Sequence, residues 1–119
     1  MPSAEELLGR ARELAPRFAA RALDTERNRA PLDESLADLV DAELLSVLTP
    51  RAYGGHQLPV RTAAAITATL SAACPSTGWV YAFYAGACWR SMMFEARTQR
   101  ELFADKPYLL NAGQAAPLA

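Results

Sequence analysis

The sequence has few of the residues that usually build a self-sufficient chemical site. Its 119 residues include two cysteines, one histidine and one lysine. A secreted disulfide framework normally has more cysteines, and a metal site needs several clustered ligands. The N-terminal stretch is polar and lacks the apolar core of a signal peptide. We therefore expect a cytoplasmic protein with reduced cysteines and no metal.

An excess of charge of either sign is also missing. Twelve basic residues face thirteen acidic ones, so the formal net charge is −1. This balance gives no electrostatic reason to expect a nucleic acid or an anionic membrane as partner. The length allows one domain with a single hydrophobic core.

The longest apolar run follows Cys74-Pro75-Ser76-Thr77-Gly78 and spans residues 79–94, where Arg90 is the only charge. A membrane span needs about 20 apolar residues, so this run is too short. A helix that is apolar all round is normally enclosed by protein. The run therefore predicts a buried central helix with Trp79 in the core, and we expect Ser76 or Thr77 to cap it.

The N-terminal segment predicts a helix with a capping box formed by Ser3 and Glu6. Pro16 predicts a kink or a break into two helices. Charged residues on the opposite face predict Glu6–Arg10 and Glu13–Arg17 pairs on a solvated surface. The apolar face consists of Leu7, Ala11, Leu14, Phe18 and Ala22.

Three further helices are expected: one from Pro31-Leu32-Asp33 to about Ser46, one over 61–73 and a short one over 95–105. Gly54-Gly55 predicts a tight loop over 49–56, in which we expect His56 to have no chemical role. The tail changes character, and residues 109–115 predict a strand that has no partner within the chain. The expected fold is an all-α bundle of about five helices, followed by the start of a β-strand.

The sequence contains no glycine-rich phosphate loop, nucleophile elbow or catalytic triad pattern. It does place five aromatic residues along the central helix, which pack a core or interface in one interpretation. In the other, they form an apolar wall beside an aromatic ligand. These residues are Trp79, Tyr81, Phe83, Tyr84 and Trp89.

The order of motifs resembles a known family. L-D-E-S-L-A-D-L-V-D-A-E-L-L is followed by L-T-P-R-A-Y-G-G, an alanine-rich helix, C-P-S-T-G-W-V and T-Q-R-E-L-F-A-D. This order is similar to the N-terminal helical domain of the acyl-CoA dehydrogenase fold. C-P-S-T-G-W-V before an aromatic helix resembles the two-component, reduced-flavin-dependent monooxygenase branch more specifically.

The resemblance implies that residues 1–107 form the helical domain and that 108–119 begin a middle β-domain, which a C-terminal helix bundle follows. Such proteins are usually tetramers that use reduced FMN or FAD, supplied by a flavin reductase, to oxidise aromatic or natural-product intermediates. Most of the flavin site lies outside the N-terminal domain, so we expect this chain alone to bind no flavin.

The resemblance places four residues beside the substrate: Trp79, Phe83, Ala87 and Gln114. The family's active-site histidine, in a pattern like G-V-H-x-W, falls on Ala87, and alanine cannot accept a proton. The family's usual glycine near the end of the second helix is replaced by Glu43, which we expect to change only how that helix ends.

Three functions remain open at this point. The chain is part of a flavin-dependent monooxygenase, a fragment of an acyl-CoA dehydrogenase, or a non-catalytic interaction or dimerisation module. An unpaired strand edge would suit the last of these, because it invites pairing with another chain.

Overall fold

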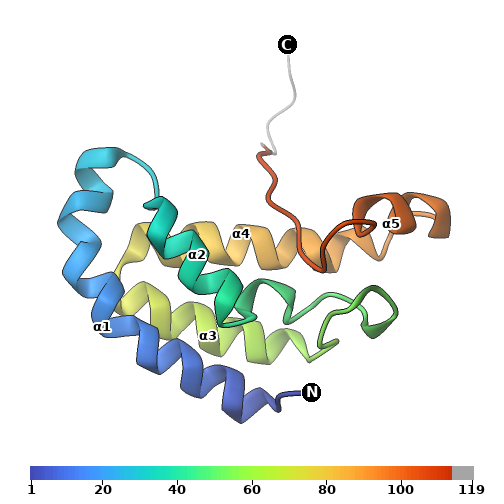
Figure 1. Cartoon of the computed structure of the whole chain (residues 1–119), viewed down its shortest axis with the longest axis horizontal. Helices are drawn as coiled ribbons and strands as arrows, with labels where there is room; N and C mark the ends of the chain where they lie inside the picture. The colour runs from blue at the N-terminus through green and yellow to red at the C-terminus, as the bar shows by residue number, and fades with distance from the viewer. Residues whose placement is uncertain (114–119) are drawn as a thin grey trace.

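A computed structural model describes residues 1–113 of the chain. Helix α3 lies between α1 and α4, and α2 crosses this layer (Figure 1). The predicted all-α bundle of five helices is confirmed over this range. The helices are α1 (Ala4–Asn28), α2 (Asp33–Asp41), α3 (Val60–Ala73), α4 (Pro75–Ser91) and α5 (Ala96–Leu102), with 3-10 turns η1 (Leu44–Ser46) and η2 (Arg51–Tyr53).

The N-terminus of α1 has the predicted capping box. The Glu6 amide donates to Ser3 Oγ at 3.2 Å, and the Ser3 amide donates to Glu6 Oε2 at 2.6 Å. Pro16 lies inside one continuous helix, which bends partway along its length (Figure 1). A proline removes one backbone hydrogen bond and crowds the preceding turn, so a bend is the expected result. The predicted apolar face is buried at Leu7, Ala11, Leu14 and Phe18, while Ala22 is half-buried.

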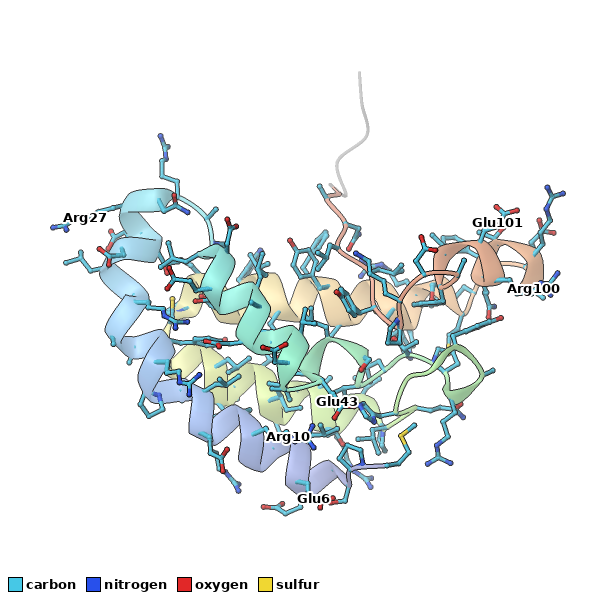
Figure 2. The ribbon with its side chains drawn as sticks, viewed as in Figure 1. Glu6, Arg10, Arg27, Glu43, Arg100 and Glu101 are labelled. Atoms are coloured by element: carbon cyan, nitrogen blue, oxygen red, sulfur yellow. The ribbon has the colours of Figure 1, made fainter. Side chains whose placement is uncertain are left out.

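The charged face of α1 is not simply solvated. Among residues 1–113, neither of the predicted pairs, Glu6–Arg10 and Glu13–Arg17, forms a direct ion pair. The pKa of Glu6 is lowered by its hydrogen bonds with Ser3, and the charge of Arg10 adds to this effect. Arg10 Nη1 lies 2.6 Å from Glu43 Oε2, and the two side chains point toward one another (Figure 2). Arg17 and Arg21 both pair with Asp38 of α2, at 3.3 and 2.7 Å. Because α2 lies over this face, its carboxylates replace the partners that α1 itself could offer.

The second helix ends at Asp41, earlier than the predicted Ser46. Glu43 adopts a left-handed backbone conformation with φ of 61°, and η1 begins directly after it. Glycine adopts this conformation without steric cost, which explains why glycine suits the position. Glu43 does more than end the helix, because its carboxylate binds Arg10 and faces His56.

The glycine-rich loop is as tight as predicted, but it buries the ring of His56. Gly54 has a φ of 87°, and a Cβ on Gly55 would collide with the carbonyl of Thr49. The His56 side chain is 3% exposed, and its Nε2 lies 3.7 Å from Glu43 Oε1, too far for a good hydrogen bond. Neither ring nitrogen has a hydrogen-bond partner among residues 1–113. Burial lowers the pKa of His56, while Glu43 opposes this shift and Arg10 and the amino terminus add to it.

α4 starts in a different way from the prediction. Cys74 is the residue before the helix and makes no side-chain cap, and Pro75 occupies the first turn, where its missing N–H costs nothing. Ser76 is exposed, and the Thr77 hydroxyl donates to Cys74 Sγ at 3.3 Å. The predicted Ser76 or Thr77 cap is therefore wrong.

The contact between α3 and α4 depends on a small residue. The face of α3 that packs into the core includes Ala63, Ile66 and Leu70, which are buried. A Cβ on Gly78 of α4 would lie 2.7 Å from Ser71 Cα of α3 and closer still to its Oγ. Because the obstacle includes backbone, the two helices can approach this closely only with glycine at position 78.

The C-terminal tail does not form the predicted strand over its described residues. Residues 109–113 form no strand, and a strand needs a neighbour to pair with its backbone, which this part of the chain does not supply. The rest of the predicted strand lies outside the described residues. Within residues 1–113, no helix combines the length and apolar character that crossing a membrane requires, and no cluster of side chains is arranged to hold a metal ion.

The buried His56 predicts a pH-dependent stability. Its pKa is below the ordinary value of about 6.5 in the folded chain, so the unfolded chain binds the proton more readily. Stability should therefore be full well above pH 6.5 and fall as the pH drops through 6.5 toward 5. Urea unfolding across this range measures the loss. His56 is the only histidine, so the slope should disappear in His56→Gln; an unchanged slope in that variant would contradict the assignment.

The close approach of α3 and α4 predicts opposite effects of alanine at two glycines of one helix. Gly78→Ala should lower the free energy of unfolding by about 1–3 kcal/mol, because it overpacks a backbone contact. In Gly86→Ala the new Cβ meets only the flexible end of Arg90, at 3.2 Å. That control should be neutral or gain up to about 1 kcal/mol from better helix propensity. Equal effects in denaturant unfolding would disprove the contact.

Candidate functional site

Helix α4 has one buried face and one open face. On the buried face, the Tyr81 hydroxyl donates to the Leu44 carbonyl at 3.2 Å, and Cys88 Sγ donates to the Leu45 carbonyl at 3.7 Å. On the open face, Trp79 is 75% exposed and Met93, just beyond the helix, is 68% exposed. The predicted burial on all sides, with Trp79 in the core, is therefore wrong. The reason is that α3, α1 and η1 cover only one side of the helix.

A pocket of about 230 Å³ lies on the open face, where the tail of the chain passes α4. Gly113 comes so close to Phe83 that a Cβ on the glycine would lie 3.5 Å from the ring atom Cζ. The Arg90 guanidinium carbon lies 5.5 Å from the centre of the same ring, which fixes the ring through a cation–π contact. The lining residues are Trp79, Val80, Phe83, Tyr84, Asn111, Ala112 and Gly113.

The structure brings two of the four predicted site residues together. Trp79 and Phe83, four residues apart on one helix, both line the pocket. Ala87, one turn further along, is 6% exposed and is not part of the lining. Gln114 lies outside the described residues.

Asn111 also lines the pocket, and no sequence motif predicted this position. Its Oδ1 is buried without a hydrogen-bond partner in the part of the chain that the structure describes, and its residue lines the pocket. The available signal was the single polar residue in the tail stretch Leu109-Leu110-Asn111-Ala112-Gly113. A polar side chain in an otherwise apolar segment next to an aromatic helix marks a place where a hydrogen bond is required.

A second hollow of about 550 Å³ lies between the end of α1 and the start of α4. Trp79 lines this hollow as well as the smaller pocket, so its exposed indole stands at the border of both. The other lining residues are Thr25, Glu26, Arg29, Ala30, Pro31, Pro75, Ser76 and Val80.

The smaller pocket can bind an aromatic ring, but its lining offers no acid or base for ordinary proton transfer. Its only polar side chains are those of Trp79, Tyr84 and Asn111, and none of its lining residues is a histidine or a carboxylate. Burial raises the pKa values of Tyr81 and Cys88, so both stay neutral, and both lie on the other face of α4. The geometry therefore supports binding and orientation of a ligand.

The two faces of α4 predict different effects of substitutions two residues apart. Trp79→Ala should change the free energy of unfolding by no more than about 0.5 kcal/mol, because the side chain is mostly exposed. Tyr81→Phe should cost roughly 1–3 kcal/mol, because it leaves the buried Leu44 carbonyl without its donor. Thermal or urea unfolding of both variants checks the pair. A large loss in Trp79→Ala with little in Tyr81→Phe would reverse the assignment of faces.

Comparison with known proteins shows which family and which relatives this chain resembles. Residues 2–103 match the model of the acyl-CoA dehydrogenase, N-terminal domain family. The chain is 58% identical to a pigment production hydroxylase from Rhodococcus sp. over 95% of its own length and 29% of that protein's. It is 31% identical to the oxygenase component of an FADH(2)-dependent resorcinol hydroxylase from Rhizobium sp., over 94% of this chain and 27% of the relative.

Solved structures agree with these relatives. The HsaA monooxygenase from M. tuberculosis superposes with a TM-score of 0.86 at 30% identity, over 89% of this chain and 29% of that one. XiaF from Streptomyces sp., in complex with FADH2 and glycerol, superposes with a TM-score of 0.82 at 31% identity, over 87% and 26%. The chain thus spans less than a third of the length of these relatives.

Proposed function

The chain belongs to the acyl-CoA dehydrogenase N-terminal domain family, and from this premise we propose that it is the N-terminal helical part of a flavin-dependent monooxygenase. In this role the open face of α4 forms one wall of the pocket that holds an aromatic or natural-product substrate. Residues 108–119 lead into a middle β-domain. The domains that would complete the enzyme lie in the same protein or in a companion chain.

One observation carries this proposal. Trp79 and Phe83 face a pocket beside the tail segment, on a helix face that the fold itself leaves uncovered. Trp79 is 75% exposed and Phe83 is half-buried beside it. A large exposed aromatic side chain at the rim of a pocket is typical of a surface that meets a partner or a ligand. The names of the relatives, a pigment production hydroxylase and a resorcinol hydroxylase, favour an aromatic ligand over an acyl-CoA thioester.

The cofactor proposed for the complete enzyme is reduced FMN or FAD, as in XiaF with its FADH2. The smaller pocket does not fit a flavin on its own. The 230 Å³ pocket has no cation to meet a phosphate, and it is smaller than the roughly 300–1,000 Å³ of typical cofactor sites. We propose that the flavin is held by the other domains and by a neighbouring subunit.

Ala87 limits what α4 contributes to the reaction. The methyl group is buried and can neither accept a phenolic proton nor donate to an oxygen intermediate. In this proposal α4 orients the substrate and excludes water, and any proton acceptor comes from another element of the complete enzyme. Gln114, next to the pocket in sequence, is proposed as a further contact with the substrate.

The proposal also covers the partner protein, the oligomeric state and the cellular location of the complete enzyme. The HsaA and resorcinol hydroxylase relatives are named as oxygenase subunits or components, so we propose a separate flavin reductase as partner. We also propose a homo-oligomer in the cytoplasm, with neither nucleic acid nor membrane as partner.

A second function is favoured by the residues that follow α4. Met92, Met93 and Phe94 are exposed side by side, with Trp89 one turn before Met92 and Met93. Exposed methionine and aromatic side chains adapt to varied partner surfaces and are common at binding sites. A non-catalytic interaction or dimerisation module would use this apolar surface without any flavin.

We expect the purified chain to be colourless and to have no oxidase activity. When it is combined with the remaining domains of the 58% identical hydroxylase, a flavin reductase and NADH, it should support oxygen consumption that depends on an aromatic substrate. The same hydroxylase domains without the chain serve as the control.

One equivalent of flavin bound to the desalted chain, visible as a yellow colour, would contradict the proposal that the other domains and a neighbouring subunit hold the cofactor. A stable complex that binds no reduced flavin would favour the interaction module. Size-exclusion chromatography of the chain and of the mixture shows which assembly has formed.

A further inference from the structure

We infer that His56 is a positioning residue whose neutral ring keeps η1 where it fastens α4, and that proton uptake by this ring moves the aromatic wall of Trp79 and Phe83. The inference rests on the proposed function for the meaning of that wall, whereas the coupling between His56 and α4 concerns the fold alone. It gives a role to a residue that does not line the pocket.

The ring of His56 is enclosed without being hydrogen-bonded. Its side chain is 3% exposed, and neither ring nitrogen has a hydrogen-bond partner among residues 1–113. A neutral imidazole has one N–H to donate, and a buried donor without an acceptor is costly. The ring can therefore gain a hydrogen bond by a small movement. A proton increases that gain, because it makes both nitrogens donors.

The charges around the ring favour one direction of movement. Burial opposes a proton on the ring, as do two positive groups nearby, Arg10 and the amino terminus. Glu43 favours it, and its Oε1 lies 3.7 Å from His56 Nε2, while its Oε2 accepts from Arg10 Nη1 at 2.6 Å (Figure 2). A charged His56 is therefore drawn toward Glu43. A movement of about 1 Å brings the two to hydrogen-bond distance.

This movement reaches η1 through the backbone. Glu43 directly precedes η1, and the His56 amide donates to the carbonyl of Ser46, the last residue of η1, at 3.0 Å. The Ser46 hydroxyl donates in turn to the Glu43 carbonyl at 3.2 Å. Glu43 and His56 thus hold the two ends of one short turn, so the turn shifts when they approach each other.

η1 in turn supplies the hydrogen bonds that fix α4. The Leu44 carbonyl accepts from the Tyr81 hydroxyl at 3.2 Å, and the Leu45 carbonyl accepts from Cys88 Sγ at 3.7 Å. Side chains of one helix keep fixed angular positions, so a displacement of η1 is passed through α4 to Trp79 on its open face. The two-state element that such coupling requires is η1, with His56 neutral in one state and charged in the other.

The experiment follows the 119-residue chain by NMR from pH 8 to pH 5, with ¹⁵N in the tryptophan indoles and in the single histidine. The Trp79 indole signal should shift gradually, with the same midpoint as the His56 ring. In His56→Gln this shift should disappear, while the Trp79 signal keeps its folded position. The amino terminus still titrates in that variant, so any shift that it causes remains visible there.

Variants at the neighbouring charges test the direction of the coupling. Glu43→Gln removes the anion that favours the proton, so the common midpoint of His56 and Trp79 should move to lower pH. Arg10→Gln removes an opposing cation, so the midpoint should move to higher pH. Glu101→Gln is the matched control, because Glu101 pairs with Arg97 within α5, and it should leave the midpoint unchanged.

A purely structural role of His56 would not give opposite shifts in the two variants. A Trp79 signal that stays still while His56 titrates would overturn the coupling and leave the proposed pocket wall intact. The inference is equally wrong if protonation replaces the Trp79 signal with that of the unfolded chain, because no folded charged state would then exist. Oxygen consumption by the completed enzyme tests the proposed function separately, so either can fail alone.

Discussion

The orientation of α4 about its own axis, which decides which of its faces meets the core, is the constraint on which the rest of the structure depends. Gly78 lets the helix approach α3 until its backbone meets Ser71, and the Tyr81 hydroxyl fastens the same face to the Leu44 carbonyl. Residues of one helix keep fixed angular positions, so these two contacts also decide where every other side chain of α4 points. Trp79 and Phe83, which lie on neither of these contacts, are thereby directed to the pocket beside the tail. The core and the candidate site are thus two consequences of one packing choice.

Local patterns were sufficient to predict the helices because local interactions determine them. The capping box at Ser3 and Glu6 and the left-handed turn at Gly54 depend on residues within a few positions of each other. The ion pairs of Arg10 with Glu43 and of Arg21 with Asp38 could not be predicted from local patterns, because both carboxylates come from a segment that meets α1 only through tertiary packing. The early end of α2 was missed for a related reason. A glutamate at φ of 61° is locally unfavourable, and what accompanies it is a contact with Arg10 across the fold.

The candidate site was predictable only in the part that one helix carries. Trp79 and Phe83 are four residues apart, so their common face follows from helix geometry alone. The opposite error, placing Trp79 in the core, arose because α4 is apolar on every side and its sequence cannot say which side the neighbours cover. Asn111 was missed because its position beside α4 depends on how the tail crosses the helix, which no local pattern encodes. Ala87 shows the limit of the resemblance, since the residue that takes the histidine's place is buried away from the lining.

This arrangement separates folding from recognition along one helix. The buried face of α4 holds Tyr81, Ala85 and Cys88, where changes in volume or hydrogen bonding act on stability. The open face holds Trp79 and borders a pocket closed on only one side by residues 111–113, so changes there act mainly on what binds. An exposed tryptophan contributes little to a fold and much to an interface, because its large apolar surface is removed from water only when a partner arrives. A chain built in this way can keep its bundle while its open face changes to suit a new ligand. The same openness means that the wall needs a second surface opposite it before it can exclude water from a bound ring.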